Sequence, residues 1–146
     1  MRALLTSLLM CGLCLQPKGP AQAEIVVVVH PDSPIKAISA REVSDLYMGR
    51  TRNVRTENQS TTVAVIEQSG NDKLRESFFR QLNGISVSQL NAYWARLRYS
   101  GDVLPPPTVS GSSLVIESVR RRRDAIGYIN ASEVTASVRV VLTLRD

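Results

Sequence analysis

The middle of the chain carries two hydrophobic periods in succession, and the other segments can be arranged around it. Residues 63–66 form a short apolar run, which predicts a buried strand, and polar residues at 67–70 predict a tight turn after it. Leu74, Phe78 and Leu82 then recur at every fourth position, with charged residues between them. This spacing places the three apolar side chains on one face of a helix. The stretch therefore predicts a strand, a turn and a helix.

The start of this predicted helix can be assigned from its polar residues. Ser69 is the predicted N-cap, and Asp72 could reach back to complete a shortened capping box. A helix start presents free backbone N–H groups and the positive end of the helix dipole, which together attract anions. The same residues also fit an ordinary capped helix, so the pattern leaves both interpretations open.

Further strands and helices are predicted on both sides of this stretch. The β-branched run at residues 25–29 predicts a strand that is buried on both faces. Ser39 with Glu42, and Ser86 with Gln89, have the spacing of capping boxes, and each pair predicts the start of a helix. The remaining predicted elements are an extended proline connector at 105–107, a helix at 110–123, and strands at 125–129 and 138–144.

Two basic segments are predicted to lie on the surface. Residues 51–61 read as a polar loop, and the arginines in and beside it could attract an anion, although a solvated loop is the favoured interpretation. Four consecutive arginines at 120–123 end a predicted helix, where they complement the negative end of its dipole. An acidic partner or ligand for these arginines is the alternative.

The order of these elements favours an α/β fold. Strands separated by helices predict a sheet of about four to five strands flanked by helices. Residues 24–146 have the length of a single domain with one core. Tyr93 and Trp94 are predicted to belong to that core, and a sugar- or peptide-binding groove at Trp94 is the alternative.

Residues 1–23 have the pattern of a cleavable signal peptide. A short positive start is followed by the apolar residues 3–15, too few to span a bilayer, and then by a small-x-small pattern that ends at Ala23. We therefore predict cleavage after Ala23 and a periplasmic location. Cleavage would remove Cys11 and Cys14, the two cysteines of the sequence, and leave no thiol for a disulfide, a metal site or a nucleophile.

Charge and residue types argue against several classes of function. The 146 residues include 18 Lys and Arg against 13 Asp and Glu, a formal net charge of +5, and loss of Arg2 and Lys18 with the signal lowers it to +3. A mildly basic exported protein is not expected to bind nucleic acid. His30 is the single histidine, no serine lies in a nucleophile elbow, and no acidic cluster has metal spacing. We expect no enzyme activity, no catalytic residue, no bound metal and no cofactor.

Four segments, taken in order, carry a resemblance to a known family. They are Val-Val-His-Pro-Asp-Ser-Pro-Ile at 28–35, the capped helix at 39–49 that ends Leu-Tyr-Met-Gly, the strand, loop and helix at 63–79, and Asp-Ala-Ile-Gly-Tyr-Ile at 124–129. They resemble the substrate-binding protein of phosphate ABC transporters, a type II periplasmic binding protein. Members have two lobes with the ligand in the cleft between them, and this chain has the length of about one lobe, matching the second. The resemblance implies a short single-lobe branch that binds phosphate without catalysis.

The segment that would bind the anion departs from this family. The family carries an arginine and then Ser-Gly-Thr at the helix start, which supply a charged partner, hydroxyls and N–H donors. An alignment anchored on Arg75 and Phe78 places Gln68 at the arginine and residues 72–74 at Ser-Gly-Thr, where an aspartate would repel phosphate. An alignment anchored on residues 69–71 keeps the serine and glycine but shifts the helix by three residues.

The resemblance implies a set of ligand-binding residues around the start of the central helix. The set comprises Ser69, Gly70 and Asn71 as hydroxyl and N–H donors, Lys73 or Arg75 as the positive charge, and Ser33 in the first loop as a further hydroxyl. A single lobe would bind phosphate or a similar small oxyanion weakly unless a homodimer rebuilds the cleft. An ABC transporter or another envelope protein would be its partner. A ligand-free lobe that acts as an interaction module in the cell envelope is the alternative.

Overall fold

The computed structural model describes residues 24–69, 72–101 and 103–145, and a mixed four-stranded sheet lies at its centre. The predicted signal peptide, its two cysteines and the site residues Gly70 and Asn71 lie outside the described residues. The strands follow the order β4, β7, β1, β8, with β4 parallel to β7 and β1 antiparallel to both of its neighbours. Their bounds are β1 (Ile25–Val29), β4 (Ala64–Val65), β7 (Ala125–Asn130) and β8 (Arg139–Leu144).

The first strand occupies an interior position in this sheet. All five residues of β1 are buried, as its continuous apolar run predicts for a strand covered on both faces. β1 pairs with β7 from Ile25 opposite Asn130 to Val29 opposite Ile126, and with β8 on its other side. The predicted strands at 25–29 and 138–144 are therefore both present, and the structure shows that they are neighbours in one sheet.

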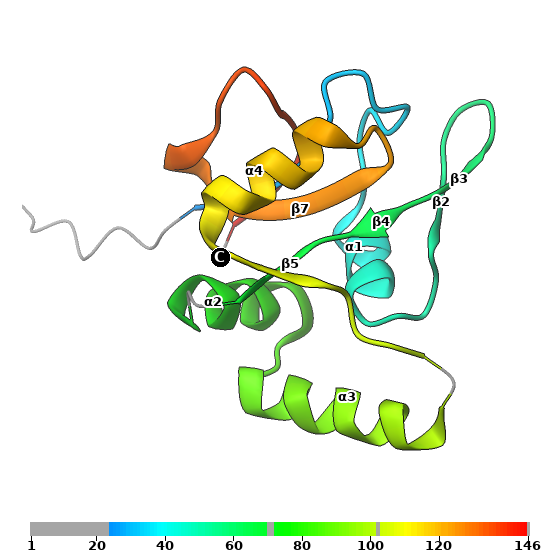
Figure 1. Cartoon of the computed structure of the whole chain (residues 1–146), viewed down its shortest axis with the longest axis vertical. Coiled ribbons are helices and arrows are strands. Elements are labelled where there is room, and N and C mark those ends of the chain that lie inside the picture. The colour runs from blue at the N-terminus through cyan, green and yellow to red at the C-terminus, as the bar shows by residue number, and fades with distance from the viewer. Residues whose placement is uncertain (1–23, 70–71, 102, 146) are drawn as a thin grey trace, which may run out of the picture.

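Helices cover both faces of the sheet (Figure 1). On one face the rings of Tyr47, Phe78 and Tyr128 pack together, with Phe78 stacked on Tyr128 at 3.7 Å between ring centroids. On the other face the helix α4 buries Val115 and Val119 against β1 and β7. The predicted α/β class, a sheet flanked by helices, is confirmed. The helices are α1 (Ala40–Tyr47), α2 (Asp72–Asn83), α3 (Val87–Ser100) and α4 (Gly111–Arg121), with a 3-10 turn at Ala131–Glu133.

Both predicted capping boxes are present. The Ser39 hydroxyl accepts a hydrogen bond from the backbone N–H of Glu42, and the Ser86 hydroxyl accepts one from the N–H of Gln89, each at 3.2 Å. The Glu42 and Gln89 side chains each accept the N–H of their serine in return. These two helices begin where the sequence predicts because the capping groups lie within four residues of each other along the chain.

The predicted turn at residues 67–70 is wrong for residues 67–69, the part of it that the structure describes. Glu67–Ser69 form strand β5, which pairs in parallel with β6 (Thr108–Ser110). The N–H of Ile66 donates to the Ile126 carbonyl at 2.8 Å, and the next N–H, that of Glu67, donates to the Pro107 carbonyl at 3.0 Å. The chain thus changes its pairing partner without stopping, so Ser69 ends a strand and α2 begins at Asp72.

The polar segment at residues 51–61 is also more regular than predicted. Asn53–Arg55 (β2) and Ser60–Thr62 (β3) form an antiparallel hairpin, which projects away from the main sheet in Figure 1. Val54 is the buried residue of β2, and its neighbours are exposed. Because the hairpin is held by backbone hydrogen bonds, its polar side chains give no apolar signal in the sequence.

Two searches over the described residues gave negative results. No helix in this part of the chain is both long and apolar enough to cross a bilayer. No group of three or more His, Cys, Asp or Glu side chains lies close enough together there to hold a metal ion.

Candidate functional site

The predicted anion site lies where β5 ends and α2 begins. Ser69 is the last residue of β5 and is partly buried, and Lys73 is exposed in the first turn of α2. Arg75 follows two positions later on the same helix. The structure thus brings these three predicted residues to one junction, while Gly70 and Asn71, which connect the strand to the helix, lie outside the described residues.

Gln68, the residue aligned with the family's arginine, is fully buried. Its Nε2 donates to the Tyr128 carbonyl at 2.8 Å and to the Ser112 hydroxyl at 3.4 Å, and that hydroxyl donates to Glu133 at 2.6 Å. The Oε1 of Gln68 has no hydrogen-bond partner among the described residues. At this position a neutral amide ties β5 to β7 and α4, and no positive charge faces a ligand.

Arg75 is engaged by a buried carboxylate. Its Nε donates to Oε1 of Glu67 on β5, and the Glu67 side chain is 2% exposed and that of Arg75 17% exposed. Burial raises the pKa of Glu67, and the hydrogen bond and charge of Arg75 oppose that rise. The Arg75 guanidinium carbon also lies 6.0 Å from the ring centroid of Phe79. Glu67 therefore neutralises most of the charge that Arg75 would offer to an anion.

Ser33 lies in a different setting from the other predicted residues. It is buried in the loop between β1 and α1, and its hydroxyl accepts the backbone N–H of Ile35 at 3.3 Å. Arg139 of β8 donates to the carbonyls of Pro31, Ser33 and Ile35 at 2.6–2.8 Å and holds the loop in place. The hydrogen bonds of Ser33 thus connect it to its own loop and to β8, not to the junction of β5 and α2.

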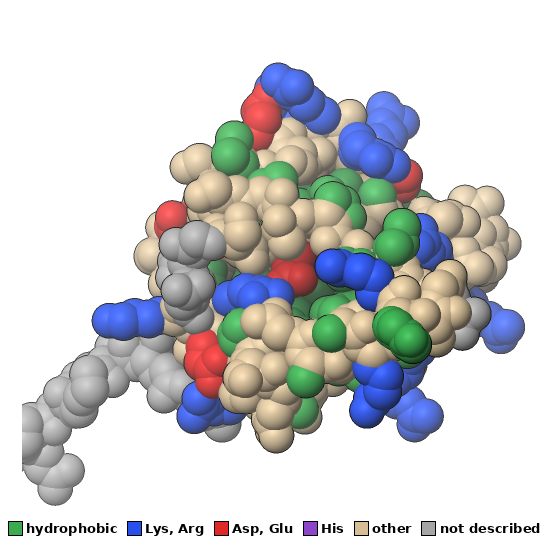
Figure 2. Space-filling model, turned by 60° about the horizontal axis from the view of Figure 1, so that its bottom comes forward, with side chains coloured by type: hydrophobic (Ala, Val, Ile, Leu, Met, Phe, Trp, Pro, Cys, Tyr) green, Lys and Arg blue, Asp and Glu red, His purple; other side chains and the backbone are tan. Residues whose placement is uncertain are grey.

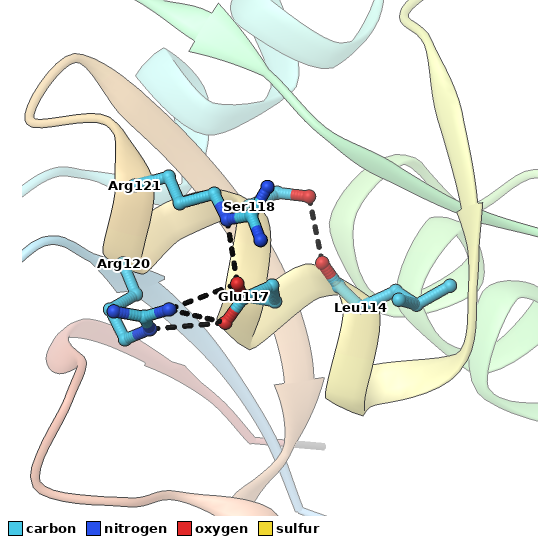
Figure 3. A network of polar contacts seen from close by, with 5 residues as sticks. All are labelled: Leu114, Glu117, Ser118, Arg120 and Arg121. Carbon is cyan, nitrogen blue, oxygen red and sulfur yellow. Dashed lines mark hydrogen bonds and ion pairs between the residues drawn. The ribbon is translucent and has the colours of Figure 1, made fainter.

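The arginine run at 120–123 is largely neutralised by acids. Figure 3 shows Arg120 and Arg121 both directed at Glu117, at 2.9 and 2.6 Å. Hydrogen bonds from Arg120 and then Arg121 lower the pKa of Glu117. The other two arginines of the run pair with Asp124 at 2.7 Å and with Asp32 at 3.6 Å. This end of α4 is therefore a poor candidate for an anion site, consistent with the helix-dipole interpretation.

Two cavities lie beside α3 and share Trp94 as a wall residue. One, of about 330 Å³, lies between the outer edge of β4 and the proline segment at 105–107. The other, of about 520 Å³, lies between α3, the proline segment and Glu67. Seen from the α3 side, Figure 2 shows an acidic side chain at the bottom of a hollow with basic side chains beside it. The spacing of residues in the sequence does not indicate these cavities, because their wall residues are separated by up to 78 positions along the chain.

Sequence comparison finds no relative, while structure comparison finds several similar folds. No family model matches the chain, and no curated protein is detectably similar to it in sequence. An ABC-type phosphate transport receptor from Vibrio cholerae aligns with 82% of this chain and 46% of its own, with a TM-score of 0.62 and 20% identity. A protein assigned as a phosphate ABC transporter substrate-binding protein from Clostridium perfringens, with phosphate bound, aligns over 82% and 45%, with a TM-score of 0.61 and 21% identity. PstS from Borrelia burgdorferi aligns over 82% and 47%, with a TM-score of 0.58 and 16% identity.

The structural match extends over about half of each similar protein. The chain spans about half the length of the solved structures that it matches, as expected if it corresponds to one of two lobes. At these identities the correspondence concerns the fold and not the ligand. The chain has the fold of a single lobe of a phosphate-transport substrate-binding protein.

Proposed function

We propose that this protein is a non-catalytic binding module of the phosphate-receptor type, which takes phosphate or a similar small oxyanion at the junction of β5 and α2. The fold of the described residues supports this proposal, because the structures that share it include a phosphate-bound receptor. The observation that carries it is local. α2 begins at Asp72, three positions after β5 ends at Ser69, and the exposed cation Lys73 lies in its first turn.

The roles proposed for the junction residues follow from their chemistry. Ser69 supplies a hydroxyl, Gly70 and Asn71 supply backbone N–H donors, and Lys73 supplies the unpaired charge. Arg75 contributes less positive charge to a ligand, because its Nε donates a hydrogen bond to the Glu67 carboxylate. Among the described residues of this junction, Lys73 is a cation without an ion pair, and with one lobe we expect a dissociation constant of about 1 mM, unless a homodimer completes the cleft.

The cellular setting is part of the same proposal. Cleavage of residues 1–23 would release the domain into the periplasm, where an ABC transporter or another envelope protein would be its partner. The domain would then present a bound oxyanion to that partner, as the two-lobed receptors do for their transporters.

A ligand-free interaction module is the second candidate, and a specific observation favours it. Gln68 and Arg75, which align with binding or flanking positions of the family, both make internal contacts instead. If these contacts replace phosphate binding altogether, the surface of the lobe would serve to bind another component of the cell envelope.

Isothermal titration calorimetry with phosphate separates the two candidates. The phosphate-binding proposal predicts saturable heat at millimolar phosphate and a clear loss of phosphate affinity in Lys73→Ala. Arg80→Ala, which removes an exposed cation from the last turn of the same helix, is the matched control and should bind as the unaltered protein does. Absence of saturable heat up to about 10 mM phosphate would support the ligand-free module.

A further inference from the structure

We propose that the larger cavity beside α3 binds a small monoanionic carboxylate that carries an apolar body. This site goes beyond the proposed oxyanion function. It touches Arg75 and Glu67, and its other polar groups are Thr108 of β6 and residues of α3, so Ser69 and Lys73 are not part of its wall. The proposal rests on the shape of the cavity, on its position against the tryptophan ring and on the balance of charge in its wall.

The wall contributed by α3 is one face of the helix. Asn91, Trp94, Ala95 and Arg98 line the cavity, and their spacing of three and four residues places them on the same side of α3. Across from them lie the extended segment at 105–107 and the buried Glu67. A volume of about 520 Å³ is within the usual range for small-molecule sites.

The indole of Trp94 supplies a hydrogen-bond donor that is left without a partner. Trp94 is 4% exposed, and its Nε1 forms no hydrogen bond with any described residue. The far edge of the ring packs closely against Gly49, where an added Cβ would lie 2.7 Å from Cη2. The Nε1 atom itself is covered by surrounding atoms, so a ligand in the cavity contacts the ring of Trp94 and not its N–H group.

The charges in the wall leave one positive charge unbalanced. Glu67 and Arg75 neutralise each other. Arg98 lines the same cavity and forms no ion pair with any described residue. The net charge of the wall is therefore that of one guanidinium, which suits a ligand with a single negative charge.

A carboxylate fits this arrangement better than phosphate does. The guanidinium of Arg98 can bind the two oxygens of a planar carboxylate in a bidentate manner. The buried carboxylate of Glu67 would repel a second negative charge on a phosphate dianion. Opposite, the prolines at 105–107 have no N–H groups and offer apolar ring surface for the body of the ligand.

The test uses benzoate as the probe and the tryptophan as the reporter. The sequence has one tryptophan, so its indole N–H gives one assignable signal in a nitrogen–proton correlation spectrum. We expect benzoate to shift that signal in a saturable manner with a dissociation constant of about 1 mM or tighter. Arg98→Gln should weaken binding about tenfold, because it removes the charge-assisted contact.

The matched control is Arg96→Gln on the same helix. Arg96 lies 5.9 Å from the ring centroid of Tyr93 and is not part of the cavity wall, so benzoate affinity should stay within about twofold of the unaltered protein. The proposal is wrong if benzoate causes no saturable shift up to about 20 mM, or if both variants bind equally well. It is also wrong if phosphate shifts the indole signal as strongly as benzoate at the same concentration.

A second pair of measurements separates this site from the proposed oxyanion site. Lys73→Ala should leave benzoate binding unchanged, and Arg98→Gln should leave the heat of phosphate binding unchanged. Absence of phosphate binding by the unaltered protein, with benzoate binding retained, contradicts the proposed function alone. Loss of benzoate binding in Lys73→Ala contradicts the assignment of the carboxylate to the α3 cavity.

Discussion

At the scale of single residues, the contact that most affects function is the buried pair of Glu67 and Arg75. Its two members are eight positions apart and lie on a strand and a helix, so neither helical nor strand spacing indicates the contact. The resemblance to the phosphate-binding family implies that Lys73 or Arg75 supplies positive charge to a ligand. The structure gives Arg75 an internal partner, because β5 continues through Glu67 where the polar residues predicted a turn.

The raised pKa of Glu67 makes a specific prediction about pH. The folded protein binds the Glu67 proton more tightly than the unfolded chain does, because burial raises the pKa above its ordinary value of 4.5. The stability that this proton confers is present below that value and is lost as the pH rises through the raised pKa. Glu67→Gln cannot ionise, so the stability of this variant relative to the unaltered protein should increase as the pH rises from about 4.5 to 7.

Urea unfolding at a series of pH values measures this difference. Glu57→Gln removes an exposed carboxylate from the hairpin loop and serves as the control, with the same pH dependence as the unaltered protein. If the free energies of unfolding of Glu67→Gln and the unaltered protein depend on pH in the same way, burial does not raise the pKa of Glu67.

At the scale of elements, locally encoded features were predictable and long-range pairings were not. The capping boxes at Ser39 and Ser86 each involve groups within one helical turn, and both are present. The pairing of Glu67 with Pro107 joins segments 40 positions apart through backbone atoms alone. The pattern of apolar and polar side chains does not reveal such a pairing. The polar hairpin formed by β2 and β3 was not predicted for the same reason.

The close contact of α4 with β7 gives a prediction at this scale. A Cβ added at Gly127 would lie 2.4 Å from Cγ1 of Val115, so Gly127→Ala should lower the free energy of unfolding by about 1 to 3 kcal/mol. Val115→Ala removes the clashing methyl groups. In the double variant the loss should therefore be smaller than the sum of the two single losses, as measured by thermal or urea unfolding. Strict additivity would mean that the loss in Gly127→Ala does not come from its contact with Val115.

At the scale of the whole molecule, the sequence resemblance located the correct fold. Four short segments pointed to one lobe of a phosphate receptor, and the structure matches such receptors over 82% of this chain. The candidate ligand-binding residues were harder to predict from the sequence than the fold. Ser33 has a suitable hydroxyl, but it is buried and accepts a hydrogen bond within its own loop. Gln68, which replaces the family's arginine, is buried and bonded internally as well, and burial depends on the packing of the complete fold.

The predicted export of the protein can be tested on the full sequence. Expression in a Gram-negative host should place the product in the periplasmic fraction, and intact mass spectrometry should find a chain that begins at Glu24. Ala23→Arg, which disrupts the small-x-small pattern, should leave the signal attached. An uncleaved chain in the cytoplasm of cells that express the unaltered sequence would contradict the predicted location.

The proposed binding of an oxyanion by a single lobe is tested most directly by a crystal structure of the protein grown with phosphate. The proposal predicts density for the anion against the backbone N–H groups of residues 70–73, with the Lys73 ammonium within contact distance. A well-ordered but empty junction at saturating phosphate, or an anion bound only elsewhere on the surface, would contradict it.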